Sequence, residues 1–311
     1  MRRIGAPADR YLRRAKLPTH VYDDAEAAVP EVFAWAFAGN VARSEGIEDL
    51  GRVAARIMPA WESEPGLVHL LQTSPTLWAG LSTFCRLAEH VSNIAPFAIE
   101  RVGDHALFRR EKRSGVPGED QAELYAVEIL MQLVRLAAGR EWLPRELLVG
   151  GENARRLSQC EDLDGVRIRH SDTMSGIVFP AELLASPMDA LSAELAMPLP
   201  DRLAGDLIGS LRAAIGSYLS DGRPDIRLVA EMSGLSERTL QRRLGSAGLS
   251  FRTLLDQVRL ERAKSMLADA DAPITDIAYD LGFSDSAHFT RAFRRWTAIS
   301  PREYRRRFRV A

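Results

Sequence analysis

Polar side chains with hydrogen-bonding groups gather in a short stretch near the C-terminus, residues 237–246. Within it, Gln241 can bond the N6 and N7 groups of an adenine and Arg242 can bond guanine O6 and N7, each worth roughly 1–3 kcal/mol of discrimination between bases. A second stretch, 286–297, has fewer such groups, so we expect the first to carry more sequence specificity. The candidates for base contacts are Arg238, Thr239, Gln241 and Arg242 in the first stretch and Ala287, His288, Thr290 and Arg291 in the second.

Other arginines nearby suit the sugar–phosphate backbone, where contacts set register and salt dependence rather than sequence preference. These candidates are Arg243, Arg252, Arg294 and Arg295. The charge distribution agrees, because residues 221–311 hold 17 Lys+Arg against 12 Asp+Glu although the whole chain has a net charge of −1. The alternative is that some of these arginines are only solvated. For the cluster of residues 305–307, a solvated helix end is the expected role.

Catalytic and metal chemistry have little support in the residues. The six histidines show no metal-ligand spacing, and none has a cysteine two to four residues away. Cys85 falls on the apolar side of a predicted helix beside Phe84, which favours a buried structural thiol over a nucleophile. No glycine-rich phosphate loop of the common forms occurs. We therefore expect no catalytic residue, no metal and no cofactor, and the two cysteines predict no disulfide framework.

The base-contact candidates occupy matching places in a pattern that occurs twice in the chain. The first copy reads Ile226, Val229, Ala230, Gly234, Leu235 and Ser236, and the second reads Ile274, Ile277, Ala278, Gly282, Phe283 and Ser284. Every pair is 48 residues apart, which is hard to obtain by chance. The next apolar pairs, Leu240 with Leu244 and Phe289 with Phe293, are 49 residues apart. One residue is therefore added at the second turn.

Each position of the pattern has a role in a helix-turn-helix. The alanine lets the second helix cross the first closely, and the glycine four residues later takes the positive φ of a sharp turn. An apolar residue fills the corner, and the serine (Ser236, Ser284) is expected to cap the following helix through its hydroxyl. Apolar pairs at i and i+4 then form one buried stripe, which places Phe289, Phe293 and Trp296 in the core. The two motifs are predicted at about 226–246 and 274–296.

One helix is predicted between the motifs, from Ser250 to about Ala268, with a length of ~27 Å at about 1.5 Å per residue. A rigid spacer of that order can place two reading helices about 34 Å apart, in successive major-groove turns on one face of B-DNA. After the second motif, Ser300-Pro301-Arg302-Glu303 predicts another helix start.

Together these residues resemble the DNA-binding domain of the AraC/XylS family of bacterial transcription regulators. The resemblance covers about the last third of the chain. It lies in Ile277-Ala278-x-x-x-Gly282-Phe283-Ser284, in Phe289 and Phe293, and in Ser300-Pro301-x-x-Tyr304-Arg305. It implies double-stranded DNA as a partner and activation through contacts with RNA polymerase, with repression at some promoters left open.

The preceding part of the chain changes its periodicity. Residues 1–93 are predicted to be mostly helical, and strands interrupted by a helix follow, which indicates an α+β domain. The strands are expected at 97–102, 105–109, 147–149, 166–169 and 175–179, and the long helix at 119–138. In order and proportions, and in Ser74-Pro75-Thr76-Leu77 and Val178-Phe179-Pro180, this half is similar to the arabinose-binding-type effector domain of one subgroup of the family. That resemblance implies a small-molecule effector, whose binding residues the sequence does not identify.

The predicted fold is an α+β N-terminal domain plus an all-α C-terminal domain with two helix-turn-helix motifs joined by a linker helix. The expected boundaries are 1–185 for the effector-binding domain, 186–206 for a proline-containing linker and 207–311 for the DNA-binding domain. Neither an apolar run of 18 residues nor an apolar N-terminal stretch occurs. We therefore expect no membrane helix, no signal peptide and a cytoplasmic location.

The function that these expectations favour is a sequence-specific transcription regulator, an activator controlled by a small effector, with a homodimer left open. Two alternatives remain. In one, the regulator has no effector and its N-terminal half only dimerises. In the other, an enzyme is fused to a DNA-reading module, although neither Cys85 nor Cys160 has the surroundings of a reactive thiol.

Overall fold

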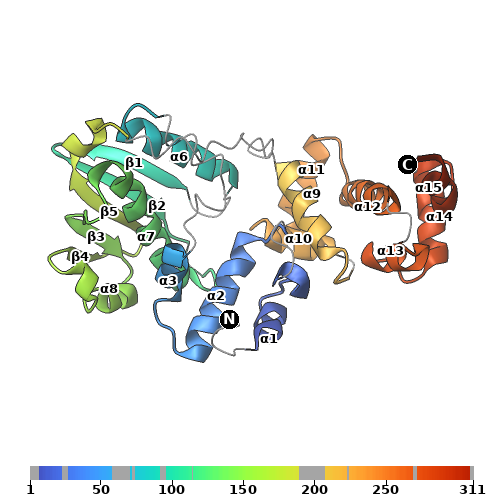
Figure 1. Ribbon diagram of the computed structural model, residues 1–311, viewed down its shortest axis with the longest axis horizontal. Coiled ribbons are helices and arrows are strands. Elements are labelled where there is room, and N and C mark those ends of the chain that lie inside the picture. The colour runs from blue at the N-terminus through green and yellow to red at the C-terminus, as the bar shows by residue number, and fades with distance from the viewer. Residues whose placement is uncertain are drawn as a thin grey trace. The chain divides into compact units, whose positions relative to one another are not determined.

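The computed structural model describes residues 7–22, 27–57, 71, 74–91, 96–113, 115–188, 207–222, 224–268 and 272–308; Figure 1 shows its ribbon. Backbone contacts divide the chain into two compact units, Met1–Tyr11 with Glu31–Gly205 and Leu12–Pro30 with Asp206–Ala311. Every strand of the described residues lies in the first unit, and the second is helical. The predicted fold class, α+β followed by all-α, is confirmed.

The first unit is built on a five-stranded sheet. Its strands are β1 (Phe97–Val102), β2 (His105–Glu111), β3 (Glu146–Val149), β4 (Arg167–His170) and β5 (Met174–Pro180). They lie in the order β1-β2-β5-β3-β4, with β3 and β4 parallel and the other neighbours antiparallel. The predicted β1–β2 hairpin is confirmed, and Gly103 takes the positive φ of its turn. The strand order is a result of the structure alone.

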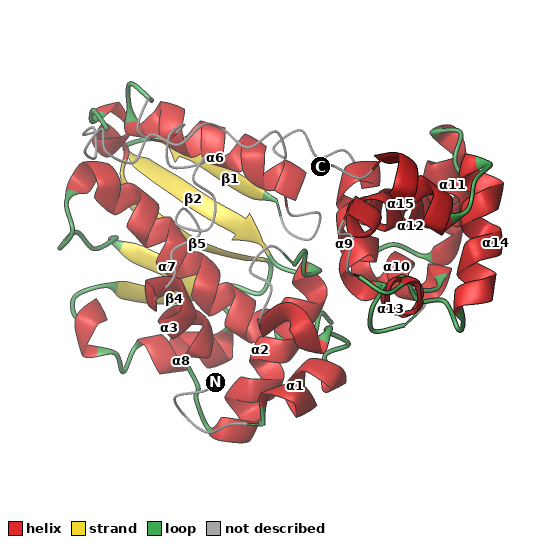
Figure 2. Ribbon diagram, turned by 45° about the vertical axis from the view of Figure 1, so that its right-hand side comes forward, coloured by secondary structure: helices red, strands yellow, loops and turns green. Residues whose placement is uncertain are grey.

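Helices cover one face of this sheet (Figure 2). Three of the side chains that point to this face, Phe108, Ile177 and Phe179, have no exposed area. Helix α7 (Glu119–Ala138) is buried along most of its length, and α6 (Leu77–Val91) packs Phe84 edge-on against Phe108 with ring centroids 5.9 Å apart. Burial of this apolar surface is the main source of the unit's stability.

Further helices complete the first unit. They are α2 (Glu31–Glu45), α3 (Leu50–Ile57), α8 (Gly151–Leu157), η3 (Glu161–Leu163) and η4 (Ala181–Ala185). Of these, α8 and η3 were not predicted. Helix α3 approaches α7 so closely that a Cβ at Gly51 would meet the carbonyl oxygen of Gln121 at 2.0 Å. The Gln121 side chain accepts a hydrogen bond from the Gly51 N–H at 2.9 Å, which fixes this contact.

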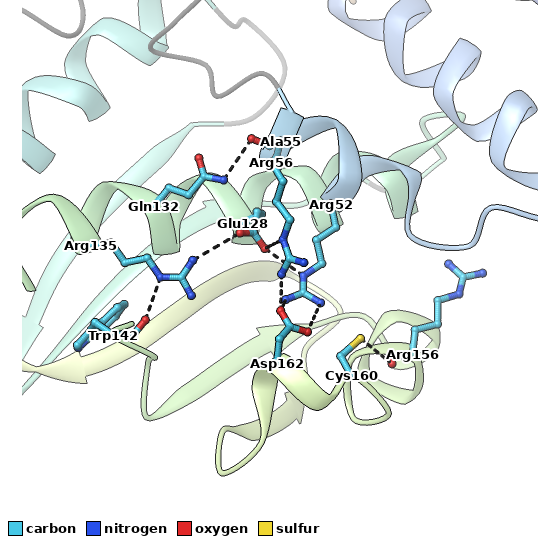
Figure 3. Close-up of polar contacts among 10 residues, drawn as sticks. All are labelled: Arg52, Ala55, Arg56, Glu128, Gln132, Arg135, Trp142, Arg156, Cys160 and Asp162. Atoms are coloured by element: carbon cyan, nitrogen blue, oxygen red, sulfur yellow. Dashed lines mark hydrogen bonds and ion pairs between the residues drawn. The ribbon is translucent and has the colours of Figure 1, made fainter. Parts of the chain in front are cut away.

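A network of charged side chains also ties α3 to α7 and η3 (Figure 3). Glu128, on α7, is buried and pairs with Arg52 at 3.0 Å, Arg56 at 3.2 Å and Arg135 at 3.6 Å. Arg52 is buried as well, and its Nη1 and Nη2 donate to the two carboxylate oxygens of Asp162 in η3. Because buried charges are costly when they lose a partner, this network favours one arrangement of the three elements.

Asp162 makes the stability of this unit depend on acidity. Partial burial pushes the pKa of Asp162 up, but hydrogen bonds from Arg52 and Arg56 outweigh it and hold the pKa below its usual value. The stabilising contribution is therefore fully present above the unfolded pKa of about 3.9 and is lost as the pH falls through the folded pKa. We expect the unfolding free energy of Asp162→Asn, measured by urea denaturation, to fall less steeply than that of the wild type as the pH is lowered below about 5. The control is Asp164→Asn, at an exposed neighbour; equal acid dependence in both variants would contradict this prediction.

The second unit consists of helices from two parts of the chain. Its C-terminal helices are α9 (Leu207–Tyr218), α10 (Ile226–Met232), α11 (Glu237–Ser246), α12 (Phe251–Ala268), α13 (Ile274–Asp280), α14 (Ser286–Thr297) and α15 (Pro301–Phe308). The spacer helix predicted from Ser250 is confirmed as α12, and Ser250 caps it by accepting from the Thr253 N–H at 3.1 Å. The Ser300 hydroxyl likewise accepts from the Glu303 N–H at 3.2 Å, which confirms the start of α15.

Residues Leu12–Pro30 also belong to this unit, although the predicted boundaries place them in the N-terminal domain. They follow the start of α1 (Ala8–Arg14) and include η2 (Thr19–Tyr22). The Thr19 N–H donates to Asp221 at 3.1 Å, and Lys16 pairs with Glu231 of α10 at 2.6 Å. No local sequence pattern in residues 12–30 predicts these partners, which are about 200 residues away in the chain. Of the predicted linker 186–206, residues 189–206 lie outside the described part of the chain.

Candidate nucleic-acid interface

The first helix-turn-helix has the geometry that its residues predict. Gly234 takes a φ of 62°, and the Leu235 N–H returns to the Ala230 carbonyl at 2.9 Å, which closes the turn after α10. Ser236 then caps α11 by accepting from the Thr239 N–H at 3.2 Å. Leu240 is fully buried. The opposite side of α11 is therefore left facing outward.

The second motif repeats this geometry with one difference. Gly282 takes a φ of 70°, and the Phe283 N–H returns to the Ala278 carbonyl at 2.9 Å. The residue that caps α14 is Asp285, which accepts from the His288 N–H at 2.6 Å, so the predicted Ser284 cap is wrong. This hydrogen bond, aided by the Ser284 hydroxyl and the charge of Arg291, lowers the pKa of Asp285.

The shifted cap explains the extra residue in the second copy. The caps Ser236 and Asp285 are 49 residues apart, as are the buried stripes of the two helices, whereas the positions before the caps are 48 apart. A carboxylate replaces the hydroxyl because both accept from the backbone at a helix start.

The structure places most base-contact candidates on the outward side of their helices. Those that are exposed are Arg238, Gln241 and Arg242 on α11 and Ala287, His288 and Arg291 on α14. Thr239 and Thr290 are half-buried, and their hydroxyls have partners. The Thr239 hydroxyl lies 2.9 Å from that of Ser236, and the Thr290 hydroxyl donates to the Ser286 carbonyl at 2.8 Å. The hydroxyls of these two threonines therefore bond within or next to their own helices in this structure.

The phosphate candidates form a less uniform group. Arg243, Arg252, Arg294 and Arg295 are all exposed. Two of them, Arg252 on α12 and Arg295 on α14, line one open cavity of about 430 Å³ together with Asp256 and Trp296. Arg295 pairs there with Asp256 at 3.2 Å. A phosphate at this cavity would meet two guanidinium groups but would have to compete with one carboxylate.

A buried arginine that the sequence did not suggest positions the second motif. Arg259, on α12, is 4% exposed and donates to the carbonyls of Leu281 at 3.0 Å and Gly282 at 3.2 Å. Its guanidinium also lies over the Phe283 ring, 4.6 Å from the centroid. It therefore anchors the turn of the second motif to the helix that joins both motifs. The sequence feature that could have identified Arg259 is its position on the buried stripe of α12, four residues after Leu255 and four before Ala263.

Two family models match the chain. The model of the helix-turn-helix domain family matches residues 229–307, and the model of the arabinose-binding domain of AraC transcription regulators matches residues 5–188, more than half of the chain. The chain belongs to the AraC family of transcription regulators. The resemblance of both halves is thereby confirmed: this is a DNA-binding regulator with an arabinose-binding-type N-terminal domain.

Individual AraC-family relatives match different shares of the chain, from about a quarter to nearly all of it, the latter in the HTH-type transcriptional regulator VirS of Mycobacterium tuberculosis, which is 24% identical over 98% of this chain and 92% of VirS. The HTH-type transcriptional regulator VqsM of Pseudomonas aeruginosa is 38% identical over 104 residues, which are 32% of this chain and 32% of VqsM. The HTH-type transcriptional activator RhaS of Escherichia coli (strain SE11) is 47% identical over 78 residues, 25% of this chain and 28% of RhaS. These matches thus span about a third or less of either relative. The crystal structure of the regulator CdpR from P. aeruginosa covers 96% of both chains at 22% identity, with a TM-score of 0.42.

The described residues also bear on the expectations about membrane helices and the two cysteines. Within the described ranges, none of the helices has the length and apolar character that crossing a membrane requires. Cys85 is buried, and the half-buried Cys160 donates from Sγ to the Arg156 carbonyl at 3.5 Å (Figure 3).

Proposed function

We propose that this AraC-family regulator is an activator that docks α11 and α14 in neighbouring major-groove turns, under the control of a small effector bound to its N-terminal domain. The observation that carries the first part is the pair of capped helices with outward polar faces, whose two motifs are joined by helix α12. A helix is the stiffest connection a chain can offer, so it fixes the separation of the two reading surfaces.

Within this proposal the exposed side chains divide into two groups. Arg238, Gln241, Arg242 and Arg291 read base edges, and Arg243 and Arg294 contact phosphates. The cavity between α12 and α14 receives a backbone phosphate through Arg252 and Arg295. Ala287 and His288 approach bases by contact rather than by bidentate bonds.

Activation, RNA polymerase and self-association belong to the same proposal. The support for activation is the name of RhaS, a transcriptional activator that is 47% identical over 78 residues. The arabinose-binding type of the N-terminal domain supports a small effector. The domain boundaries are proposed at 1–185, 186–206 and 207–311, except that residues 12–30 pack with the C-terminal unit. Two copies of the chain are proposed to act together on DNA.

Arg242→Ala tests the base-reading assignment. Loss of a bidentate contact with guanine should weaken operator binding by about 1–3 kcal/mol, roughly 5- to 150-fold, and relax preference at one base pair. Gel shifts on a library of single-base operator variants measure both effects. The matched control is Arg243→Ala, its neighbour, which should weaken all sequences about equally and lower the salt slope by about 1. If both variants behave like Arg243→Ala, Arg242 does not read a base.

Thermal unfolding tests the effector part. The full chain is screened against sugars, amino acids and small organic acids, and a ligand of the native state stabilises it by RT ln(1 + [L]/Kd), about 2.7 kcal/mol at 100 times Kd. We expect at least one such compound to change affinity for operator DNA as well, because control requires different affinity for two states. Compounds that raise Tm but leave DNA affinity unchanged would reject effector control. A panel without any stabilising compound favours a domain that only dimerises.

A further inference from the structure

The sheet of the first unit has a second face, opposite the one that carries the core. Side chains alternate along each strand, so neighbours of the buried Phe108 and Ile177 point the other way. At the centre of this second face, which we name the open face, lie Leu107, Val178 and Leu148, all half-buried and outside the core cluster. Helices α6, α7 and α8 send their side chains into the core instead. Over the described residues, these three helices thus leave the open face uncovered.

The strand register makes the middle of the open face an apolar strip. Leu107 of β2 is the direct partner of Val178 on β5, and Gly176 on β5 is the partner of Leu148 on β3. Val102, at the end of the edge strand β1, pairs with His105 and is 63% exposed, so it adds a separate apolar side chain near one end of the face. Strand β5 therefore runs along the centre of the strip, with two strands on either side (Figure 1).

Two groups of charged side chains flank this strip. One contains an arginine between two glutamates, and the other contains a glutamate with two arginines. On β1 and β2, Arg109 pairs with Glu100 at 2.7 Å and Glu111 at 3.3 Å, so this acidic triad has a net charge of −1. On the other side of β5, Glu146 pairs with two arginines of β4. These pairs measure 3.1 Å to Arg167 and 3.2 Å to Arg169, so this basic triad has a net charge of +1. The open face therefore has an acidic side and a basic side about an apolar middle.

Such a face is complementary to itself under one kind of twofold symmetry. A rotation about an axis parallel to β5 brings a second sheet face to face with the first and exchanges the two sides. It sets β1 opposite the partner's β4 and β2 opposite the partner's β3. A twofold axis across the strands would instead set like charges against each other, which costs several kcal/mol.

We propose that the open face is the dimer interface between two copies of this chain, with the twofold axis along β5. This inference rests on the homodimer in the proposed function and gives it a surface and an orientation. The acidic triad of each copy meets the basic triad of the other. Val178 on β5 meets its own counterpart at the axis, and because β2 faces the partner's β3, Leu107 of each copy lies towards Leu148 of the other. Aligned packing of two sheets in this way is common among β-sandwiches.

The dimensions of the face predict the strength of the association. Neighbouring strands lie about 4.8 Å apart; β1, β2 and β5 extend about 20 Å and the four-residue strands β3 and β4 about 13 Å, which gives roughly 400 Å² per copy. Stable interfaces bury about 800 Å² per partner, so the dimer should be weak in solution and strengthened when both copies bind neighbouring DNA sites. Since Arg167 and Arg169 are 70% and 61% exposed, their charges select the orientation more than they add affinity.

Charge reversal in pairs tests the proposal. The double variants Arg167→Glu/Arg169→Glu and Glu100→Arg/Glu111→Arg each set like charges together in a homodimer. We expect each to raise the dissociation constant of the dimer at least about tenfold in sedimentation equilibrium of the full chain. An equimolar mixture of the two should form a heterodimer, because both contacts then join opposite charges. The quadruple variant, in which both triads are reversed, should dimerise with itself.

The matched control is Arg140→Glu/Arg155→Glu, which changes the net charge as much as Arg167→Glu/Arg169→Glu does, at exposed positions in the turn after α7 and on α8. It should dimerise like the wild type. A wild type that stays monomeric at about 100 µM, double variants that dimerise normally, or a mixture and a quadruple variant that both stay monomeric would each overturn the proposal. Gel shifts on a single-site duplex serve as a separate readout. If the wild type does not bind this duplex, the proposed function is wrong, whereas the dimer measurements still decide on this interface.

Discussion

Gly282→Val should abolish specific DNA binding and lower the unfolding free energy of the C-terminal unit by about 4 kcal/mol, in the range of the largest single-residue effects. Gly282 has a φ of 70°, a conformation in which a β-branched side chain is strained. A Cβ there would also lie 2.9 Å from the Gly222 carbonyl oxygen and 3.0 Å from that of Leu219. Both are backbone atoms, so the turn itself would have to move, and α14 with it.

Gly248→Val is the matched control for this experiment. Gly248 has a φ of 71°, but a Cβ there would meet nothing within 4 Å. It therefore carries the conformational strain without the collision. Urea denaturation followed by circular dichroism, together with gel shifts, should show a much larger loss for Gly282→Val. Equal losses in the two variants, or operator binding that survives in Gly282→Val, would mean that the close approach at this turn is unimportant.

Arg259→Met should have the second largest effect. Methionine keeps the apolar stem but leaves the carbonyls of Leu281 and Gly282 without their donor, at a cost of about 1–3 kcal/mol each when buried. Loss of the contact with the Phe283 ring removes about 1 kcal/mol more. We expect an unfolding free energy lower by about 3 kcal/mol and an operator affinity at least about tenfold weaker, because α14 loses its fixed position relative to α12.

The control for charge is Arg262→Met, on the same helix but exposed. It removes one positive charge and should change stability by less than about 0.5 kcal/mol. Hydrogen exchange gives the decisive readout, since only Arg259→Met should speed exchange of the amides in the turn between α13 and α14. If the two variants weaken DNA binding to the same degree, the effect is one of charge and the anchoring role of Arg259 is wrong.

Much of the C-terminal unit was predictable because its signals are local. A glycine four residues after a small residue predicts a turn, and Gly234 and Gly282 both have the positive φ that this requires. Ser236 and Ser250 cap their helices as expected, since a cap bonds to an amide only three residues away. The same locality explains the error at Ser284, because two adjacent residues can both accept a hydrogen bond from the backbone. Asp285 is the one in register with α14.

Long-range partners were not predictable from spacing. Arg259 binds carbonyls more than twenty residues away, and Lys16 binds Glu231 from the opposite end of the chain. In the sheet, the placement of β5 between β2 and β3 decides which side chains become neighbours. Nothing in the sequence of β3 or β4 indicates that Glu146 would face Arg167 and Arg169.

The amino-acid sequence by itself determined the fold class, the two helix-turn-helix motifs and their outward-facing residues, because periodicity, capping and turn residues act within a few positions of each other. Only the tertiary structure decided which residue caps α14, which buried arginine anchors the second motif, how the five strands are ordered and where residues 12–30 pack. Those features depend on groups that meet only after the chain has folded, and the physical reason is that apolar burial brings them together without regard to their distance in sequence.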